Sequence, residues 1–335
     1  MTWGEKGGLE RLSNPRSTVG GSASQASAHF MLFRTLILQL AQNKTFLNWV
    51  RRLAIRSGLA QRFVAGENVS EVLDVVRDLH GIGIAATLNL LGEEVKDEKE
   101  AEAAANASME LLRAIDRNSM KSQIPLKLSQ LGLRISKETC SGHLEAILEV
   151  SRELDNFIRI DMEGSRYTQA TIDLFLEHFA SYGNHLGIVI QSYLYRSEED
   201  IYRLIQLPCN IRLCKGAYME SEEIAYAKKG DVDRNFIELM EDIFLSPSYL
   251  AIATHDNQIL EHACRFVAQH GIDLDQFEFQ MIHGIGREAQ QRLRQEGYAV
   301  RVYVPFGTEW APYFVRRLAE RPANFFFLLK HLLRN

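Results

Sequence analysis

The run Gly187-Ile188-Val189-Ile190-Gln191-Ser192-Tyr193 is the clearest sign of the architecture of this chain. It is mostly apolar and does not alternate with polar residues, as expected of a parallel strand covered on both faces, and a helix-length segment follows it. Seven further runs share this character: Ile82 to Leu88, Ile124 to Leu128, Phe157 to Asp161, Ile211 to Lys215, Leu250 to Thr254, Phe277 to Ile282, and Ala299 to Val304. Eight strand–helix units predict an α/β fold, a (βα)8 barrel of the TIM type.

An open, doubly wound parallel sheet is the competing architecture. Such a sheet usually carries a glycine-rich turn after its first strand, and Leu91-Gly92-Glu93-Glu94 is not one. Apolar residues at three- and four-residue spacing predict helices before the first run. We therefore expect a helical arm over 31–80 and a barrel over 81–335. The first thirty residues, rich in Ser and Gly, predict a disordered leader or a cloning remnant.

The overall charge excludes one class of partner. The chain has 335 residues, with 38 basic against 43 acidic side chains and a net charge of -5, so no basic stripe is available to follow a nucleic-acid backbone. No stretch is apolar for the roughly 20 residues that a spanning helix needs. Four scattered cysteines fit reduced thiols in a cytoplasm.

Polar residues end almost every predicted strand. In a (βα)8 barrel the active site lies at the carboxyl mouths of the strands, so these residues are candidates by position. They are Asn89, Glu93, Lys127, Asp161, Glu163, Gln191, Arg212, Lys215, Thr254, His255, Asp256, Gln280, His283 and Tyr303.

Lys127 stands between two leucines, and burying its cation requires a ligand or a carboxylate. Asp161 could be that carboxylate, or it could accept a hydrogen bond from a flat heterocycle. Gln191 could read the edge of a ring or be a satisfied barrel amide. The run from Arg212 to Tyr218, with Lys215 and two small residues, suits a diphosphate and an electron-rich ring.

Near the C-terminus, Arg316 and Arg317 are adjacent on an amphipathic helix, and Glu320 lies one turn away. Two guanidiniums make a fork that suits a carboxylate, which points to a small anionic substrate; a solvated, salt-bridged helix face is the alternative. Metal chemistry is not expected, because the ten histidines include neither a His-x-His strand end nor a His-Glu-x-x-His helix.

Six motifs, in order along the chain, resemble those of proline dehydrogenases. They are Leu126-Lys127-Leu128-Ser129-Gln130-Leu131-Gly132, Arg212-Leu213-Cys214-Lys215-Gly216-Ala217-Tyr218, Ala253-Thr254-His255-Asp256, Phe277-Glu278-Phe279-Gln280, Tyr303-Val304-Pro305-Phe306-Gly307 and Arg316-Arg317-Leu318-Ala319-Glu320-Arg321-Pro322-Ala323-Asn324. The resemblance covers about residue 60 to the C-terminus. It is strongest to the monofunctional bacterial form, which is similar to the proline dehydrogenase domain of the bifunctional proline utilization proteins.

The resemblance implies a distorted barrel that binds FAD noncovalently, with the last helix over the mouth. It implies oxidation of L-proline to Δ1-pyrroline-5-carboxylate, the first step of proline catabolism to glutamate, by hydride transfer to flavin N5. Electrons would pass to a quinone, and the product to a separate pyrroline-5-carboxylate dehydrogenase. The location would be cytoplasmic, with a peripheral contact at the inner face of the membrane left open.

The resemblance also implies roles for individual residues. Lys127, Arg316 and Arg317 would hold the proline carboxylate, with Glu320 beside them. Catalysis would involve Asp161 and Arg212, and Glu93 would gate the site by pairing with Arg316. An apolar wall would come from Tyr218, Ile282, Tyr303 and Tyr313. FAD would contact Asp161, Met162, Gln191, Arg212, Lys215, Gly216, Ala217, Thr254 and His255. Asn89 stands where many relatives carry aspartate, which leaves the role of that position open.

Three other functions remain open at this point. One is 4-hydroxyproline oxidation by the same flavin, against which the bulk of Tyr303 argues. Another is a Schiff-base aldolase that uses Lys127 or Lys215, a common chemistry for this barrel. The last is a binding barrel without turnover.

Overall fold

The computed structural model describes residues 43–56, 58–92 and 95–320, with the side chains of 44, 55, 59 and 316–320 left aside. The leader expected over 1–30 lies outside the described residues.

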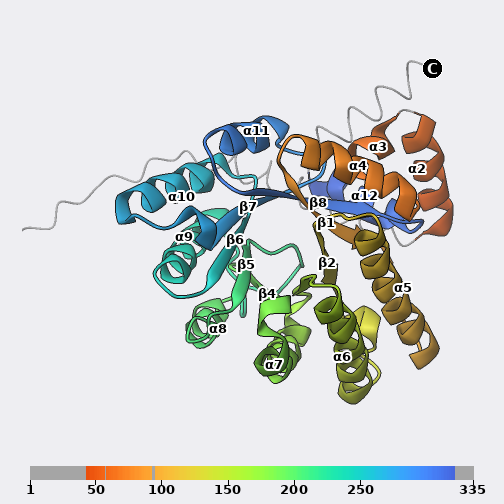
Figure 1. The fold of residues 1–335 in the computed structure, drawn as a ribbon, viewed down its shortest axis with the longest axis horizontal. Coiled ribbons are helices and arrows are strands. Elements are labelled where there is room, and N and C mark those ends of the chain that lie inside the picture. The colour runs from red at the N-terminus through yellow and green to blue at the C-terminus, as the bar shows by residue number, and fades with distance from the viewer. Residues whose placement is uncertain (1–42, 57, 93–94, 321–335) are drawn as a thin grey trace, which may run out of the picture.

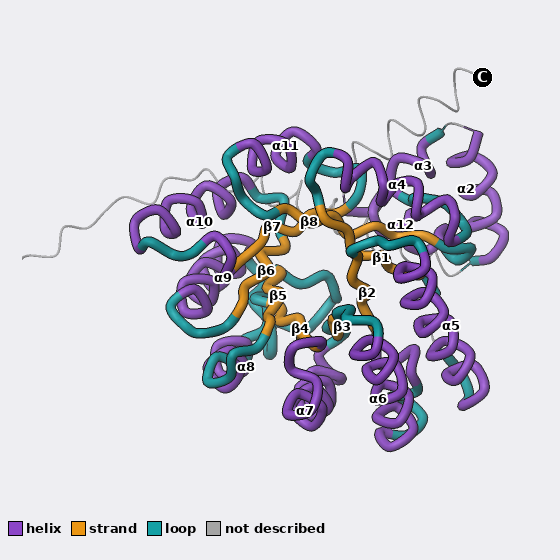
Figure 2. The backbone as a smooth tube through the Cα atoms, viewed as in Figure 1, coloured by secondary structure: helices purple, strands orange, loops and turns teal. Residues whose placement is uncertain are grey.

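Eight parallel strands close into a barrel in chain order, each paired with the next and β8 paired with β1 (Figure 2). The predicted fold class is confirmed. The strands are β1 (Ala85–Leu90), β2 (Ser122–Leu126), β3 (Ile158–Ile160), β4 (Leu186–Gln191), β5 (Asn210–Cys214), β6 (Tyr249–Ala253), β7 (Phe277–Ile282) and β8 (Val300–Phe306).

A helix follows every strand, and these helices surround most of the ring (Figure 1). Their bounds are α5 (Glu98–Arg117), α6 (Lys137–Glu153), α7 (Ser165–Tyr182), α8 (Ser197–Leu204), α9 (Lys229–Phe244), α10 (Asn257–His270), α11 (Arg287–Gln295) and α12 (Trp310–Glu320). Before β1 lie α2 (Lys44–Arg56), α3 (Leu59–Phe63) and α4 (Val69–Gly81). No helix in the described ranges is long and apolar enough to cross a bilayer.

The predicted runs match the strands to within three residues at either end, and β7 matches at both. The largest difference is at β1, where Ile82 belongs to the turn that ends α4. The backbone N–H groups of Ile82 and Ile84 both donate to Leu79 O, at 3.2 and 2.9 Å. Local hydrogen bonding at a helix end therefore outweighs the β-branched character of these residues.

The apolar core lies between the strands and the surrounding helices, whereas the inside of the barrel is unusually polar. Arg159 is completely buried on β3, and its Nη2 donates to Asn210 Oδ1 at 2.6 Å. Arg301 Nε donates to the buried Glu278 Oε1 at 2.8 Å. Burial, and next the charge of Arg212, lower the pKa of Arg159 to about 9. The apolar shell outside the strands thus supports a charged interior.

The helices before β1 have two different packing partners. Helix α4 packs on β1 and β8, and its Val72 and Val76 belong to the barrel core. Helices α2 and α3 instead pack on α12, where Phe63 and Phe314 lie in a separate buried cluster with ring centroids 6.0 Å apart. The limits of the helical arm and of the barrel domain stay a prediction.

We predict opposite effects on stability from two glycine substitutions. Gly284 has φ +78°, and a Cβ there would overlap Arg62 O at the end of α3. Gly284→Ala should therefore lower the free energy of unfolding by about 2–4 kcal/mol. Gly142 lies inside α6 with no atom within 4 Å of an added Cβ, so Gly142→Ala should raise it by about 0.5–1 kcal/mol. Urea titration of both variants measures the difference, and equal effects would contradict the close contact at Gly284.

Candidate active site

Asp161 joins three strands at the carboxyl mouth of the barrel. It directly follows β3, and its Oδ1 accepts a hydrogen bond from Arg212 Nη1 of β5 at 2.7 Å. Its Oδ2 accepts from the hydroxyl of Tyr303 of β8, also at 2.7 Å. The Arg212 guanidinium lies over the Tyr303 ring, with Cζ 5.3 Å from the centroid. Both oxygens of Asp161 therefore accept hydrogen bonds from other strands, which fixes the orientation of the carboxylate.

Tyr303 takes part as a hydrogen-bond donor as well as an apolar ring. Burial, and next the charge of Asp161, raise its pKa well above the usual value. Its phenol therefore stays protonated and continues to donate to Asp161. Tyr313 of α12 contributes to the same shift, which places the last helix within electrostatic reach of Tyr303.

Arg212 has donor capacity to spare. Only 5 % of this residue is exposed, yet within the described part of the chain its Nε and Nη2 have no hydrogen-bond partner. Buried guanidinium N–H groups nearly always have acceptors, so these two are available to a ligand that offers acceptor atoms.

Gln191 and Glu163 connect the mouths of β2, β3 and β4. Gln191 Nε2 donates to the backbone oxygen of Glu163 at 2.9 Å. The Glu163 carboxylate accepts two hydrogen bonds from Ser129, from N–H at 3.0 Å and from Oγ at 2.6 Å. From the sequence, Glu163 was predicted only as a residue at the barrel mouth, and Ser129 was not among the candidate site residues. The spacing of Glu163, two residues beyond Asp161, was the available signal.

Lys127 directly follows β2 and borders a cavity of about 340 Å³. Leu126, Gln130 and Thr308 also line this cavity. The lysine precedes a 3-10 turn, η1 (Leu128–Leu131), and Gln130 N–H donates to Lys127 O at 3.0 Å. The backbone at Lys127 is therefore fixed where its side chain meets the cavity.

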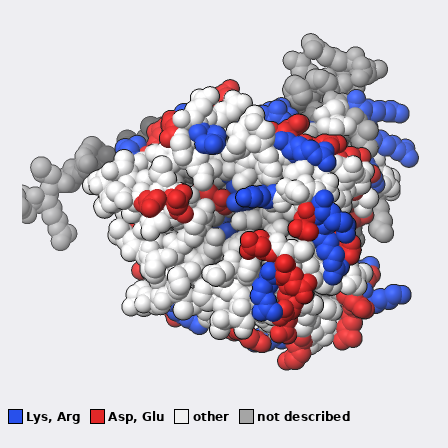
Figure 3. Space-filling view, in the orientation of Figure 1, with Lys and Arg blue, Asp and Glu red and all other residues white. Residues whose placement is uncertain are grey.

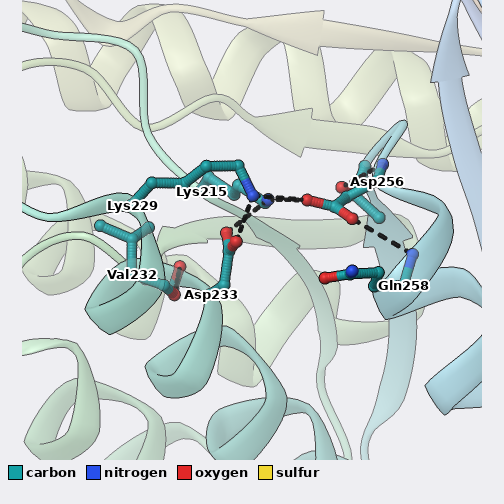
Figure 4. Close-up of polar contacts among 8 residues, drawn as sticks. Lys215, Lys229, Val232, Asp233, Asp256 and Gln258 are labelled. Carbon is teal, nitrogen blue, oxygen red and sulfur yellow. Dashed lines mark hydrogen bonds and ion pairs between the residues drawn. The ribbon is translucent and has the colours of Figure 1, made fainter. Parts of the chain in front are cut away.

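Lys215 and Lys229 approach the same two carboxylates, those of Asp233 and Asp256 (Figure 4). Lys215 Nζ lies 2.5 Å from Asp233 Oδ1 and 2.7 Å from Asp256 Oδ2. Lys229 Nζ lies 2.9 Å from Asp256 Oδ2 and also pairs with Asp233. Two carboxylates therefore engage the Lys215 side chain, an arrangement that does not suit the nucleophilic amine of a Schiff-base aldolase.

The segment from Thr254 to Asp256 links β6 to its neighbours. Asp256 caps α10, since its Oδ1 accepts from Gln258 N–H at 3.2 Å. Thr254 Oγ1 accepts from Asp256 N–H at 3.1 Å. His255 Nε2 accepts from the backbone N–H of Ile282 at 3.0 Å, so in this bond the neutral imidazole carries its proton on Nδ1. His255 and Ile282 are thereby connected directly.

The loop after β5 is tied down at three places. Gly216 has φ +111°, and a Cβ there would overlap the Tyr193 ring. The carboxylate of Glu220 caps α7, accepting from Ser165 N–H and Oγ, both at 2.7 Å. Farther along, Ala225 forms a β-bridge with Leu194. Ala217 and Tyr218 lie between these anchors, and Tyr218 is 43 % exposed at the rim.

Four of the predicted site residues fall wholly or partly outside the described residues. Glu93 lies outside the described residues. Arg316, Arg317 and Glu320 belong to α12, but their side chains also lie outside them. Met162 is buried beside Asp161, and Asn89 is buried near the end of β1.

In the described ranges no three metal-ligating side chains gather at one place. Figure 3 shows acidic and basic side chains intermixed on the viewed face, with no single-sign stripe.

Comparison with known proteins identifies the family. A sequence model described as proline dehydrogenase matches residues 72–329. The chain belongs to the proline dehydrogenase family. Its relatives include proline dehydrogenase 1 of Bacillus subtilis (strain 168), 42 % identical over 303 residues, which cover 90 % of this chain and 100 % of the relative. Proline dehydrogenase of Deinococcus radiodurans is 37 % identical over 90 % of this chain and 98 % of its own.

The barrel of this proline dehydrogenase family member also resembles a solved structure. The crystal structure of proline utilization A from Bdellovibrio bacteriovorus, inactivated by N-propargylglycine, superimposes with a TM-score of 0.76 and 24 % identity. The match covers 88 % of this chain and 37 % of that one. At this identity the likeness establishes the fold, and the chain spans little more than a third of the larger protein.

We predict that Asp256 contributes pH-dependent stability to this proline dehydrogenase family member. Burial alone would raise its pKa, but the hydrogen bonds from Lys215 and Lys229 outweigh burial and lower it to about 2. The ion pairs of Asp256 with the two lysines therefore stabilise the fold above about pH 4, and that stability is lost as the pH falls towards 2. Asp256→Asn should cost about 1–2 kcal/mol at pH 7 and almost nothing at pH 2.

Asparagine is an equally good helix cap, so this substitution removes the charge while keeping the cap of α10. Denaturant unfolding at several pH values measures the difference. A difference independent of pH would show that the charge of Asp256 does not stabilise the fold.

Proposed function

We propose that this enzyme uses noncovalently bound FAD to oxidise L-proline to Δ1-pyrroline-5-carboxylate, the reaction of its family. The observation that carries the proposal is Arg212, whose buried guanidinium is held by Asp161 while two of its nitrogens lack acceptors among the described residues. A flavin, whose ring and phosphates are rich in acceptors, fits that donor set.

When bound, FAD supplies a two-electron acceptor, while the protein supplies binding, orientation and charge. We assign Asp161, Met162, Gln191 and Arg212 to the ring. Arg212 would hold positive charge where electrons arrive, and the bond from Tyr303 would keep Asp161 in place beside it. We assign the rest of the cofactor to Lys215, Gly216, Ala217, Thr254 and His255.

The substrate needs a fixed carboxylate more than a paired amine. Removal of a hydride from the ring carbon requires a neutral ring nitrogen, so ion pairing at nitrogen would oppose the reaction. We therefore propose that Lys127, Arg316 and Arg317 hold the carboxylate and thereby orient the carbon. Glu320 would orient the arginine pair, and Glu93 would close the site by pairing with Arg316.

The remaining contacts with the substrate are apolar. We assign Tyr218, Ile282, Tyr303 and Tyr313 to the wall around the pyrrolidine ring. The bond from Ile282 N–H to His255 would link this wall to the cofactor side of the site. Electrons would leave to a quinone, which would bring the enzyme from the cytoplasm to a membrane surface. A separate pyrroline-5-carboxylate dehydrogenase would take the product.

We predict that the purified protein is yellow and that anaerobic proline bleaches its visible flavin absorbance. The physical reason is that electrons from proline remain on the flavin when no acceptor is present. Visible absorbance before and after proline is the measurement, with glycine as the control amino acid. A protein that remains colourless after incubation with FAD would overturn the proposal.

We predict that Arg316→Lys or Arg317→Lys raises KM for proline about tenfold, because a point charge does not replace a bidentate fork. The value of kcat should change less than KM if the arginines hold ground state and transition state alike. Steady-state kinetics with a dye acceptor measures both. Arg117→Lys, on the exposed face of α5, is the matched control and should leave the kinetics unchanged. Wild-type kinetics in both arginine variants would remove the pair from the site.

A further inference from the structure

Glu163 is a buried carboxylate with an unusual partner. Only 7 % of the residue is exposed, and both of its oxygens accept hydrogen bonds from a single residue, Ser129, which is 2 % exposed. Two bonds to one partner fix distance and orientation together, as a single bond does not. Burying a carboxylate costs free energy unless hydrogen bonds compensate, and here Ser129 supplies them.

Ser129 lies two residues after Lys127 and belongs to the η1 turn that follows it. Helix α6 holds the other parts of this turn from outside. Cys140 Sγ donates to Leu128 O at 3.5 Å, and His143 Nδ1 lies 3.0 Å from Leu131 O. Glu163, in the segment between β3 and α7, holds Ser129 of the same turn. The backbone that carries Lys127 is therefore held from both sides.

The charge of Glu163 also acts on Cys140, which contacts this turn from α6. Burial, and next the charge of Glu163, raise the pKa of the Cys140 thiol to about 12. This agrees with the geometry, in which the Glu163 carboxylate faces the same turn that Cys140 contacts from α6.

Glu163 also fixes the strand next to its own. Its backbone oxygen accepts from Gln191 Nε2, and it follows Asp161 by two residues. Asp161 N–H in turn donates to Leu126 O at 2.8 Å, directly before Lys127. Glu163 therefore connects the proposed carboxylate anchor, just after β2, with two groups that we assign to the flavin ring. These are Asp161, just after β3, and Gln191, at the end of β4.

We propose that Glu163 is a positioning residue that, through Ser129, sets the place of Lys127 relative to the Asp161–Gln191 side of the mouth. The inference deepens the proposed function and rests on it. Proline is small and rigid, so an error in the place of its carboxylate is passed directly to the carbon that reacts. Glu163 touches neither substrate nor cofactor in this proposal and acts through Lys127.

The test compares two substitutions and two substrates. Glu163→Gln keeps an oxygen that accepts from Ser129 N–H, and its amide can donate to Ser129 Oγ, so it should change KM for proline by less than about threefold. Glu163→Ala removes both bonds and should raise KM for proline about tenfold. Pyrrolidine lacks the carboxylate, so its rate of flavin reduction should be the same in Glu163→Ala and wild type.

Further measurements separate positioning from a general structural role. The Kd for FAD, measured by fluorescence, should be unchanged in both variants. In a Lys127→Met background, Glu163→Ala should have no added effect on proline, because the residue acts through that lysine. Glu177→Ala is the matched control, since Glu177 accepts from Ser141 Oγ at 3.3 Å between α6 and α7, away from the mouth.

Equal losses with proline and pyrrolidine, or a weakened Kd for FAD, would overturn the inference. Should Glu163→Ala fail to fold, Ser129→Ala leaves the carboxylate in place and should raise KM for proline about threefold, again without effect on pyrrolidine. Failure of the proposed function is distinguishable, because wild-type protein would then bind no FAD or would not be bleached by proline.

Discussion

The ion pair between Asp161 and Arg212 is the constraint on which the barrel mouth depends. A buried guanidinium and a partly buried carboxylate stabilise each other only while both are present, and loss of one leaves the other charged and unpaired. Tyr303 donates the second hydrogen bond to the same carboxylate from β8, the strand that closes the barrel on β1. Three strands that are far apart in sequence therefore meet at one carboxylate, which makes the relative position of their ends a property of the whole barrel.

The apolar shell stabilises the fold enough to offset the cost of these buried charges. Residues that face the helices from β3, β4 and β5, such as Ile160, Ile188 and Leu213, are completely buried, and together with the helices they form one large core. Because this core stabilises the fold, the inward faces of the strands can hold charged residues. They carry Arg159, Glu278 and Arg301. A closed sheet also leaves no strand edge unpaired, so polar residues at the mouth are held by backbone on both sides.

The sequence predicted the strands well because continuous apolar runs are the direct mark of parallel strands buried on both faces. The partner of Asp161 could not be predicted, since the register that brings Arg212 and Tyr303 to it follows from the closure and stagger of the barrel. Lys215 was expected to face a diphosphate, and its two aspartates come from other elements, α9 and the turn before α10. Ser129 lay within one of the family motifs but was not singled out, because a serine three residues beyond a strand is ordinary. Ile82 was expected in a strand because composition cannot reveal a helix end that is set by backbone hydrogen bonds.

The cluster that joins α2, α3 and α12 connects the two ends of the described chain. Val50 and Phe63 near one end pack in the same buried group as Phe314 and Val315 near the other. Helix α12 also bears the arginine pair of the proposed substrate site. A protease cut or a truncation that removed the first helices would strip the apolar cover from α12. Loss of α2 and α3 would then weaken binding of the amino acid at the proposed site on α12.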